Sequence, residues 1–200
     1  MKKDLTELVI IIDKSGSMHH LKEDVIGGYN SLIQKQHEEG NTIVTTVFFN
    51  DTVDFIHEQV DIGALKPIDG RSYQPRGCTA LLDAVGDAID YIRSKHSKLK
   101  EEDLPEHTIF SIMTDGLENA SREYSYSQIK RKIEFQKKCG WEFIFQAANI
   151  DANMEADRLG IDRDMTMQFV ASSKGVHDTM YKCCCMVSDI KKKSNRVSKK

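Results

Sequence analysis

A continuous apolar stretch near the amino terminus limits what this chain can fold into. Residues 8–12 read LVIII, and the stretch stops at Asp13. Val and Ile without alternating polar positions are typical of a strand that is buried on both faces, as in a parallel sheet covered by helices. Ligands of such sheets bind just beyond the carboxyl ends of the strands. The residues that follow 8–12 are therefore the first candidates for a functional site.

Oxygen-bearing side chains follow this strand at alternate positions. Asp13, Ser15 and Ser17 are separated by Lys14 and Gly16. A carboxylate and two hydroxyls are hard oxygen donors, which suit Mg²⁺, Mn²⁺ or Ca²⁺ better than zinc. The sequence therefore predicts a metal-binding loop at the end of the first strand.

The remaining chain alternates between strand and helix patterns. We expect further strands at 42–50, 53–60, 106–114, 141–148 and 165–170, and helices at 19–39, 81–92, 125–138, 151–159 and 174–190. The apolar spacing of the helix at 81–92 predicts that Val85 is buried and that Asp83, Asp87 and Asp90 are exposed, and Phe135 is expected on the buried side of the helix at 125–138. The tight turn at Asn50-Asp51 returns the strand at 53–60 antiparallel at a half-exposed edge. The predicted fold is a doubly wound α/β domain with a mostly parallel central sheet, one antiparallel edge strand and helices on both faces.

Two later residues are candidates for the same site. Thr79 follows a loop with Pro67, Gly70, Pro75 and Gly77 and lies at the start of the expected helix at 81–92, where a plain N-cap is the alternative role. Asp115 follows a second buried strand, EHTIFSIMT. Because parallel strands end at one edge of the sheet, two strands deliver carboxylates to the same place.

With these residues in view, the sequence resembles a von Willebrand factor type A domain with a metal-ion-dependent adhesion site. The motifs DKSGSM, GCTAL and MTDGLEN match the DxSxS, threonine and aspartate positions of that family, and the resemblance covers about residues 5–190. It is greatest to the small stand-alone bacterial members, including those found near tellurite and stress resistance genes. The resemblance implies a Rossmann-like fold.

The same resemblance implies roles for the site residues. Ser15, Ser17 and Thr79 would bind Mg²⁺, or Mn²⁺ or Ca²⁺, through their hydroxyls, while Asp13 and Asp115 would bind directly or hold coordinated waters. With neutral groups directly bound, the metal keeps one position for a further ligand. In the family that ligand is typically a carboxylate from a partner protein.

Charge divides the chain into an acidic body and a basic end. The net charge is -3, and the last ten residues carry +6, so residues 1–190 carry -9. We expect one domain at 1–190 and a basic, disordered tail at 191–200, which could instead contact an acidic partner. A nucleic-acid partner is not expected, because phosphate binding requires a basic face on the domain itself.

The amino terminus and the cysteines indicate a cytoplasmic protein. MKKDLTEL lacks the apolar region and cleavage site of a signal peptide, and no stretch approaches the length of a membrane span. The five cysteines are an odd number without a CxxC pair, which favours reduced, structural thiols. We therefore expect no membrane partner.

The predicted function is a divalent-metal-dependent adaptor that binds a protein ligand, in bacterial stress or tellurite resistance. His19 and His20 are expected to be solvated residues rather than metal ligands. An enzyme is not expected, because no HExxH, P-loop or GxSxG motif occurs. The alternatives are a metal-dependent phosphohydrolase, since carboxylates with Mg²⁺ also serve phosphoryl transfer, and a metal-independent scaffold.

Overall fold

The fold is a six-stranded sheet between two layers of helices. A computed structural model describes the backbone of residues 1–197 and the side chains of residues 1–192. The sheet order is β3-β2-β1-β4-β5-β6, and only β3 is antiparallel to its neighbour. The strands are β1 (Lys2–Asp13), β2 (Thr42–Phe49), β3 (Val53–Asp61), β4 (Pro105–Thr114), β5 (Trp141–Ala147) and β6 (Thr166–Gln168). The predicted sheet with one antiparallel edge strand is confirmed.

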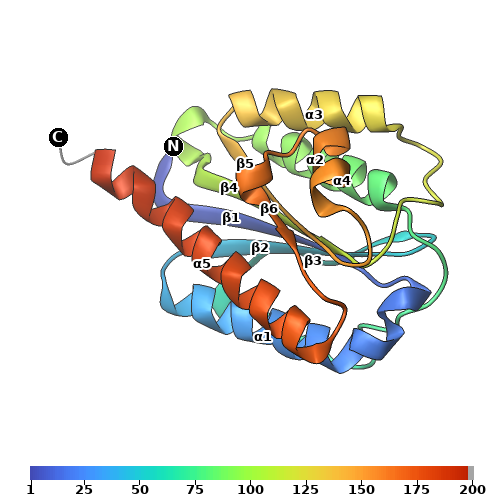
Figure 1. The fold of residues 1–200 in the computed structure, drawn as a ribbon. Helices are drawn as coiled ribbons and strands as arrows, with labels where there is room; N and C mark the ends of the chain where they lie inside the picture. The colour runs from blue at the N-terminus through green and yellow to red at the C-terminus, as the bar shows by residue number, and fades with distance from the viewer. Residues whose placement is uncertain (198–200) are drawn as a thin grey trace.

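Helices cover both faces of this sheet, as predicted. They are α1 (Lys22–Glu38), α2 (Leu81–His96), α3 (Tyr126–Lys138), α4 (Ala152–Leu159) and α5 (Ser173–Val197). Helices α1 and α5 lie on one face, and α2, α3 and α4 lie on the other (Figure 1). No helix in the described part of the chain is both long and apolar enough to cross a membrane.

The apolar run in β1 explains why this strand lies at the centre of the sheet. Each residue from Leu8 to Ile12 is at most 2% exposed. Successive side chains of a strand point to opposite faces. Leu8, Ile10 and Ile12 accordingly join the core beneath α1 and α5, whereas Val9 and Ile11 join the core beneath α2, α3 and α4.

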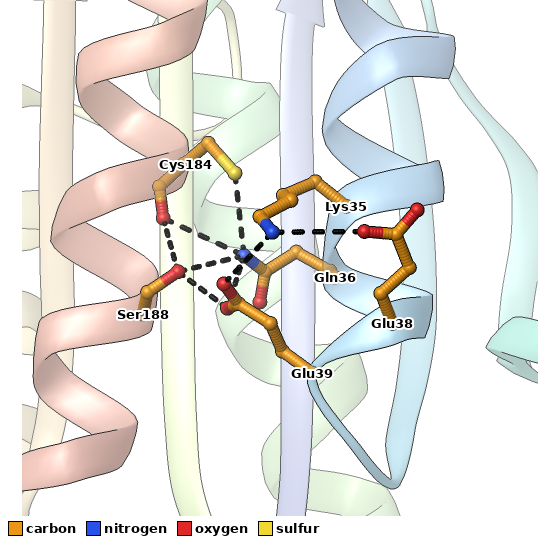
Figure 2. Close-up of polar contacts among 6 residues, drawn as sticks. All are labelled: Lys35, Gln36, Glu38, Glu39, Cys184 and Ser188. Atoms are coloured by element: carbon orange, nitrogen blue, oxygen red, sulfur yellow. Dashed lines mark hydrogen bonds and ion pairs between the residues drawn. The ribbon is translucent and has the colours of Figure 1, made fainter.

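Polar contacts hold α5 against α1. Figure 2 shows Gln36 and Glu39, at the end of α1, facing Cys184 and Ser188 of α5. The Gln36 amide nitrogen lies 3.4 Å from Cys184 Sγ and 3.3 Å from Ser188 Oγ, and the Ser188 hydroxyl donates to the Glu39 carboxylate. These bonds join α1, in the first half of the chain, to α5, near its end.

Close packing also explains a glycine within α1. A Cβ added to Gly28 would lie 2.9 Å from Met180 Cγ, which is closer than carbon atoms pack. Glycine in a helix interior costs about 1 kcal/mol relative to alanine. At Gly28 the absence of a side chain allows Met180 of α5 to pack against the α1 backbone.

Several predicted boundaries differ from the observed ones. The expected helix at 19–39 is divided into a 3-10 helix, Gly16–Leu21, and α1. Helix α5 continues to Val197, past the predicted boundary at residue 190, and Lys191 Nζ donates to Thr42 Oγ1 over 3.1 Å. The remaining residues of the predicted tail, 198–200, lie outside the described part of the chain.

Two predicted helix faces need correction. Phe135, expected on the buried side of α3, is 56% exposed, and Gln136 is buried instead. The expected exposed aspartates of α2 are half-buried rather than exposed, because Asp83 and Asp90 accept hydrogen bonds from other elements. Val85, by contrast, is fully buried on the inner face of α2, as expected.

Candidate metal centre

Three loops at the carboxyl edge of the sheet bring the five predicted residues together. Ser15 Oγ lies 3.0 Å from Ser17 Oγ, and the Ser17 hydroxyl donates to Asp115 Oδ1. A Cβ added to Gly116 would lie 3.7 Å from Thr79 Oγ1 and 3.8 Å from Ser17 Oγ. The Ser17 hydroxyl therefore contacts the carboxylate that follows β4, and the Thr79 hydroxyl lies near the next residue, Gly116.

Asp13 is buried at the base of this cluster. Its Oδ1 accepts the Ser15 backbone N–H over 2.6 Å, and its Oδ2 accepts the Thr114 hydroxyl over 2.6 Å. Burial raises the pKa of Asp13 to about 6, although both hydrogen bonds act in the opposite direction. A nearby cation would stabilise the ionised form of a carboxylate in this position.

Asp115 has an oxygen without a partner. Its side chain is buried, and burial raises its pKa. Oδ1 accepts from Ser17, but Oδ2 has no hydrogen-bond partner among the residues whose side chains are described. A buried acceptor without a partner is costly. A divalent cation between this oxygen and the hydroxyls would remove that cost, so the residues fit a hard metal ion.

The donor set distinguishes this cluster from common transition-metal sites. Among the described residues, no group of three or more His, Cys, Asp or Glu side chains could hold a metal. The candidate centre instead combines two carboxylates with three hydroxyls. Such oxygen donors suit Mg²⁺ or Mn²⁺ rather than a metal that prefers sulfur or imidazole.

Backbone hydrogen bonds join the first loop to the loop that carries Thr79. Gly16 N donates to Gly77 O over 3.0 Å, and Arg76 N donates to Lys14 O over 2.8 Å. Gly77 has a φ of 77°, in the left-handed region that favours glycine, and a Cβ there would lie 1.9 Å from Asp51 Oδ2. Glycine at 77 is therefore required for this junction.

The structure also assigns positions to residues around the predicted five. Tyr73 is buried, and its hydroxyl donates to Asp13 O over 2.6 Å. His19 and His20 are exposed, as expected, and His20 Nδ1 lies 2.8 Å from Ser17 O. The Thr79 side chain does not cap α2, whose N-cap residue is Ala80. The alternative role of Thr79 as a helix cap is therefore wrong.

Sequence reasoning missed Thr114 and Tyr73 as neighbours of Asp13. Thr114 ends β4, and pairing of Ile12 with Met113 sets the register that places it beside Asp13. Tyr73 lies in a segment whose prolines and glycines indicated only a loop. An isolated large aromatic residue within such a loop was the available signal for a buried anchor.

Several solved structures share this architecture. The vWF domain of the type V pili tip protein Mfa5 from Porphyromonas gingivalis matches with a TM-score of 0.64 and 10% identity, over 92% of this chain and 96% of that chain. The chain has a von Willebrand factor type A fold. A scan of protein-family models and a search of curated proteins find no match.

Two further proteins with the von Willebrand factor type A fold were solved with metals. Proximal thread matrix protein 1 from the mussel byssus, with a zinc-occupied MIDAS motif, matches with a TM-score of 0.58 and 14% identity, over 92% of this chain and 46% of that one. Manganese-loaded TRAP protein from Plasmodium vivax matches with a TM-score of 0.52 and 18% identity, over 80% and 63%. This chain thus spans less than two thirds of either protein.

Proposed function

We propose that this von Willebrand factor type A domain is a divalent-metal-dependent protein-binding module. The observation that carries the proposal is Asp115 Oδ2, which is buried and has no hydrogen-bond partner among the described side chains, while Oδ1 of the same carboxylate accepts the Ser17 hydroxyl. Asp13, Ser15, Ser17, Thr79 and Asp115 would hold Mg²⁺ or Mn²⁺. The bound ion would supply a positive centre able to accept a carboxylate from a partner protein.

The residues of the chain determine how that centre would act. Neutral hydroxyls withdraw little of the ion's charge, so the ion would remain attractive to an acidic ligand. Asp13 is held by two hydrogen bonds and lies deeper than Ser17, which is exposed. An incoming ligand would therefore approach from the Ser17 side. Leu117, 53% exposed and two residues after Asp115, offers an apolar contact to the same ligand.

The first experiment measures metal binding and its dependence on the site. Isothermal titration of the purified chain with MnCl₂ and MgCl₂ should show one site, and Asp115→Asn should remove it. Capture of partners from a bacterial lysate should then succeed with Mg²⁺ and fail with chelator. No metal binding at millimolar concentration would contradict the proposal, and capture that is equal in chelator would support a metal-independent scaffold.

The proposal excludes chemical turnover by this chain. A metal-dependent phosphohydrolase is the rival, and it would hydrolyse a model phosphate ester in a metal-dependent manner. We expect no hydrolysis. Activity that survives purification and is lost in Asp115→Asn would replace the adaptor function with the enzymatic one.

A cytoplasmic role in bacterial stress or tellurite resistance is the finer part of the proposal. It rests on the resemblance of the DKSGSM, GCTAL and MTDGLEN motifs to small bacterial members of the family. Deletion of the gene should then sensitise the cell to tellurite, and the chain with Asp115→Asn should fail to restore growth. Full restoration by that variant would separate the stress role from the metal centre.

A further inference from the structure

The loop that carries Asp115 is bonded to the backbone of Thr79. We call residues 115–124 the Asp115 loop. Thr79 N donates to Asn119 Oδ1 over 2.9 Å, and Thr79 O accepts Asn119 N over 3.0 Å and Ala120 N over 3.2 Å. Both backbone polar groups of a proposed metal ligand are thus held by the loop that supplies another.

Glu118 fixes the same loop to the first turn of α2. Its carboxylate accepts four hydrogen bonds: from Leu82 N (3.0 Å), Ala120 N (2.9 Å), Ser121 N (2.7 Å) and Ser121 Oγ (2.7 Å). The first N–H groups of a helix lack partners within the helix, and a negative charge there is favourable. Glu118 therefore provides the cap that the Thr79 side chain does not.

Asp83 of α2 holds the other half of the loop. It accepts hydrogen bonds from Arg122 N at 2.8 Å and from Glu123 N and Tyr124 N, both at 3.0 Å. Glu118 thus reaches from the loop to the helix, and Asp83 reaches from the helix to the loop. These hydrogen bonds, which run in both directions, hold the start of α2 and the Asp115 loop together.

We propose that Asn119 and Glu118 are positioning residues that set the Thr79 hydroxyl relative to the Asp115 carboxylate. The inference rests on the proposed metal-binding function and adds to it the residues that preorganise the site. Without the bonds to Asn119 and Glu118, the Thr79 segment would have to be ordered when the ion binds. Outer partners that orient metal ligands typically affect metal affinity by about 10- to 100-fold.

The test compares two substitutions of Asn119 by Mn²⁺ titration calorimetry. Asn119→Leu removes the acceptor for Thr79 N and should weaken Mn²⁺ binding by about 10-fold. Asn119→Asp keeps an oxygen within reach of that N–H and should restore most of the lost affinity. A failure of Asn119→Asp to restore affinity while Asn119→Leu lowers it would contradict positioning through this hydrogen bond.

Asn30→Leu is the matched control. Asn30 also clamps a backbone segment, with Oδ1 accepting Ile68 N and Nδ2 donating to Ile68 O, both over 3.0 Å. It does so on α1, without a bond to a proposed ligand. Asn30→Leu should lower the melting temperature as Asn119→Leu does, while Mn²⁺ affinity stays at the wild-type value. Equal loss of affinity in both variants would show a general effect of stability and overturn the inference.

A double-mutant cycle connects Asn119 to Thr79. In a Thr79→Ala background, Asn119→Leu should cause little further loss of Mn²⁺ affinity, because the hydroxyl that it positions is gone. Amide hydrogen exchange in chelator supplies a readout without metal: the Thr79 N–H should be protected in the wild type and lose protection in Asn119→Leu. Additive losses in the cycle, or unchanged protection, would overturn the role of Asn119.

The outcome also separates this inference from the proposed function. A wild-type chain that does not bind Mn²⁺ would overturn both, because the residues would have no ion to position. A wild-type chain that binds Mn²⁺, with an Asn119→Leu variant that binds equally well, would overturn the positioning role alone.

Discussion

The two ends of the buried part of β1, residues 6–13, each hold a carboxylate, and the two carboxylates differ in their hydrogen-bond partners. Glu7, near the start of this buried part, is fully buried. Its Oε2 pairs with His96 Nε2, and its Oε1 accepts Gln59 Nε2 over 2.6 Å. At the other end, Asp13 lies beside Asp115, whose Oδ2 has no described partner.

We infer from this difference that Glu7 belongs to a structural polar cluster, whereas Asp13 belongs to the proposed binding site. Both oxygens of Glu7 are satisfied within the chain, and the Trp141 ring packs edge-on against His96 at 5.4 Å between centroids. Such a completed cluster has no need of a ligand. At the Asp13 end, Asp115 Oδ2 has no hydrogen-bond partner among the residues whose side chains are described, and the same carboxylate contacts exposed Ser17.

The largest effect on stability should come from removing the Glu7 carboxylate from its polar cluster. Glu7→Leu leaves the half-buried His96 and Gln59 side chains without their shared acceptor and should cost roughly 3 kcal/mol of folding free energy, since each lost partner costs about 1 to 3 kcal/mol. Urea denaturation in chelator would measure the loss, with Asp115→Asn as the comparison. Similar small losses in both variants would mean that the Glu7 cluster is not structural.

The second effect should be the stabilisation of the native state by metal bound at the candidate centre. A ligand at about 100 times its dissociation constant stabilises the native state by about 2.7 kcal/mol. Mn²⁺ at that excess should raise the melting temperature of the wild type, and Asp13→Ala should abolish most of the shift. Persistence of the full shift in Asp13→Ala would place the ion elsewhere on the protein.

The stability of the metal-free fold should depend on pH through Asp13. Because the pKa of Asp13 rises from 3.8 to about 6 on folding, the native state holds this proton more tightly than the unfolded state. Asp13 should therefore favour the metal-free fold at low pH, and this contribution of roughly 3 kcal/mol should be lost as pH rises from about 4 through 6. Denaturation in chelator at pH 5 and pH 7 should show this decline in the wild type.

Asp13→Asn provides the control for that titration, since it cannot ionise. The decline in stability between pH 5 and pH 7 should be reduced in this variant. Mn²⁺ affinity of the wild type should change in the opposite direction and fall as pH drops through 6, because protons compete with the ion for Asp13. An Asp13→Asn variant with the wild-type pH dependence would assign the decline to other groups.

The smallest effect on stability should come from Thr79→Ala. Thr79 is buried, but its side chain does not cap α2, so the free energy of unfolding in chelator should fall by no more than about 1 kcal/mol. Mn²⁺ affinity should nevertheless fall, because one hydroxyl is lost from the site. Calorimetry and urea denaturation on the same sample would check both, and a stability loss well above that limit would restore a structural role for the hydroxyl.

The sequence by itself determined the architecture, and it predicted the residues that the fold brings to the candidate site. Five consecutive apolar residues from Leu8 to Ile12 predicted a central strand buried on both faces, and the structure confirms it. Asp13 and Asp115 were found because each follows a buried strand, and strand ends are visible where apolar runs stop. These features depend on residues close together in the chain, so local pattern is sufficient to read them.

Only the tertiary structure decided which hydrogen-bond partners the buried carboxylates of Glu7 and Asp13 have. The β1–β4 register places Thr114 against Asp13, and helix α2 brings His96 to Glu7, from positions far apart in the sequence. Local pattern also placed exposed Phe135 on the buried side of α3, because helical spacing does not reveal where the neighbouring layer ends. Hydrogen-bond partners of a buried carboxylate are set by strand register and helix packing, which form only when distant segments meet. The completed cluster at Glu7 and the open one at Asp13 therefore became distinguishable only in the folded chain.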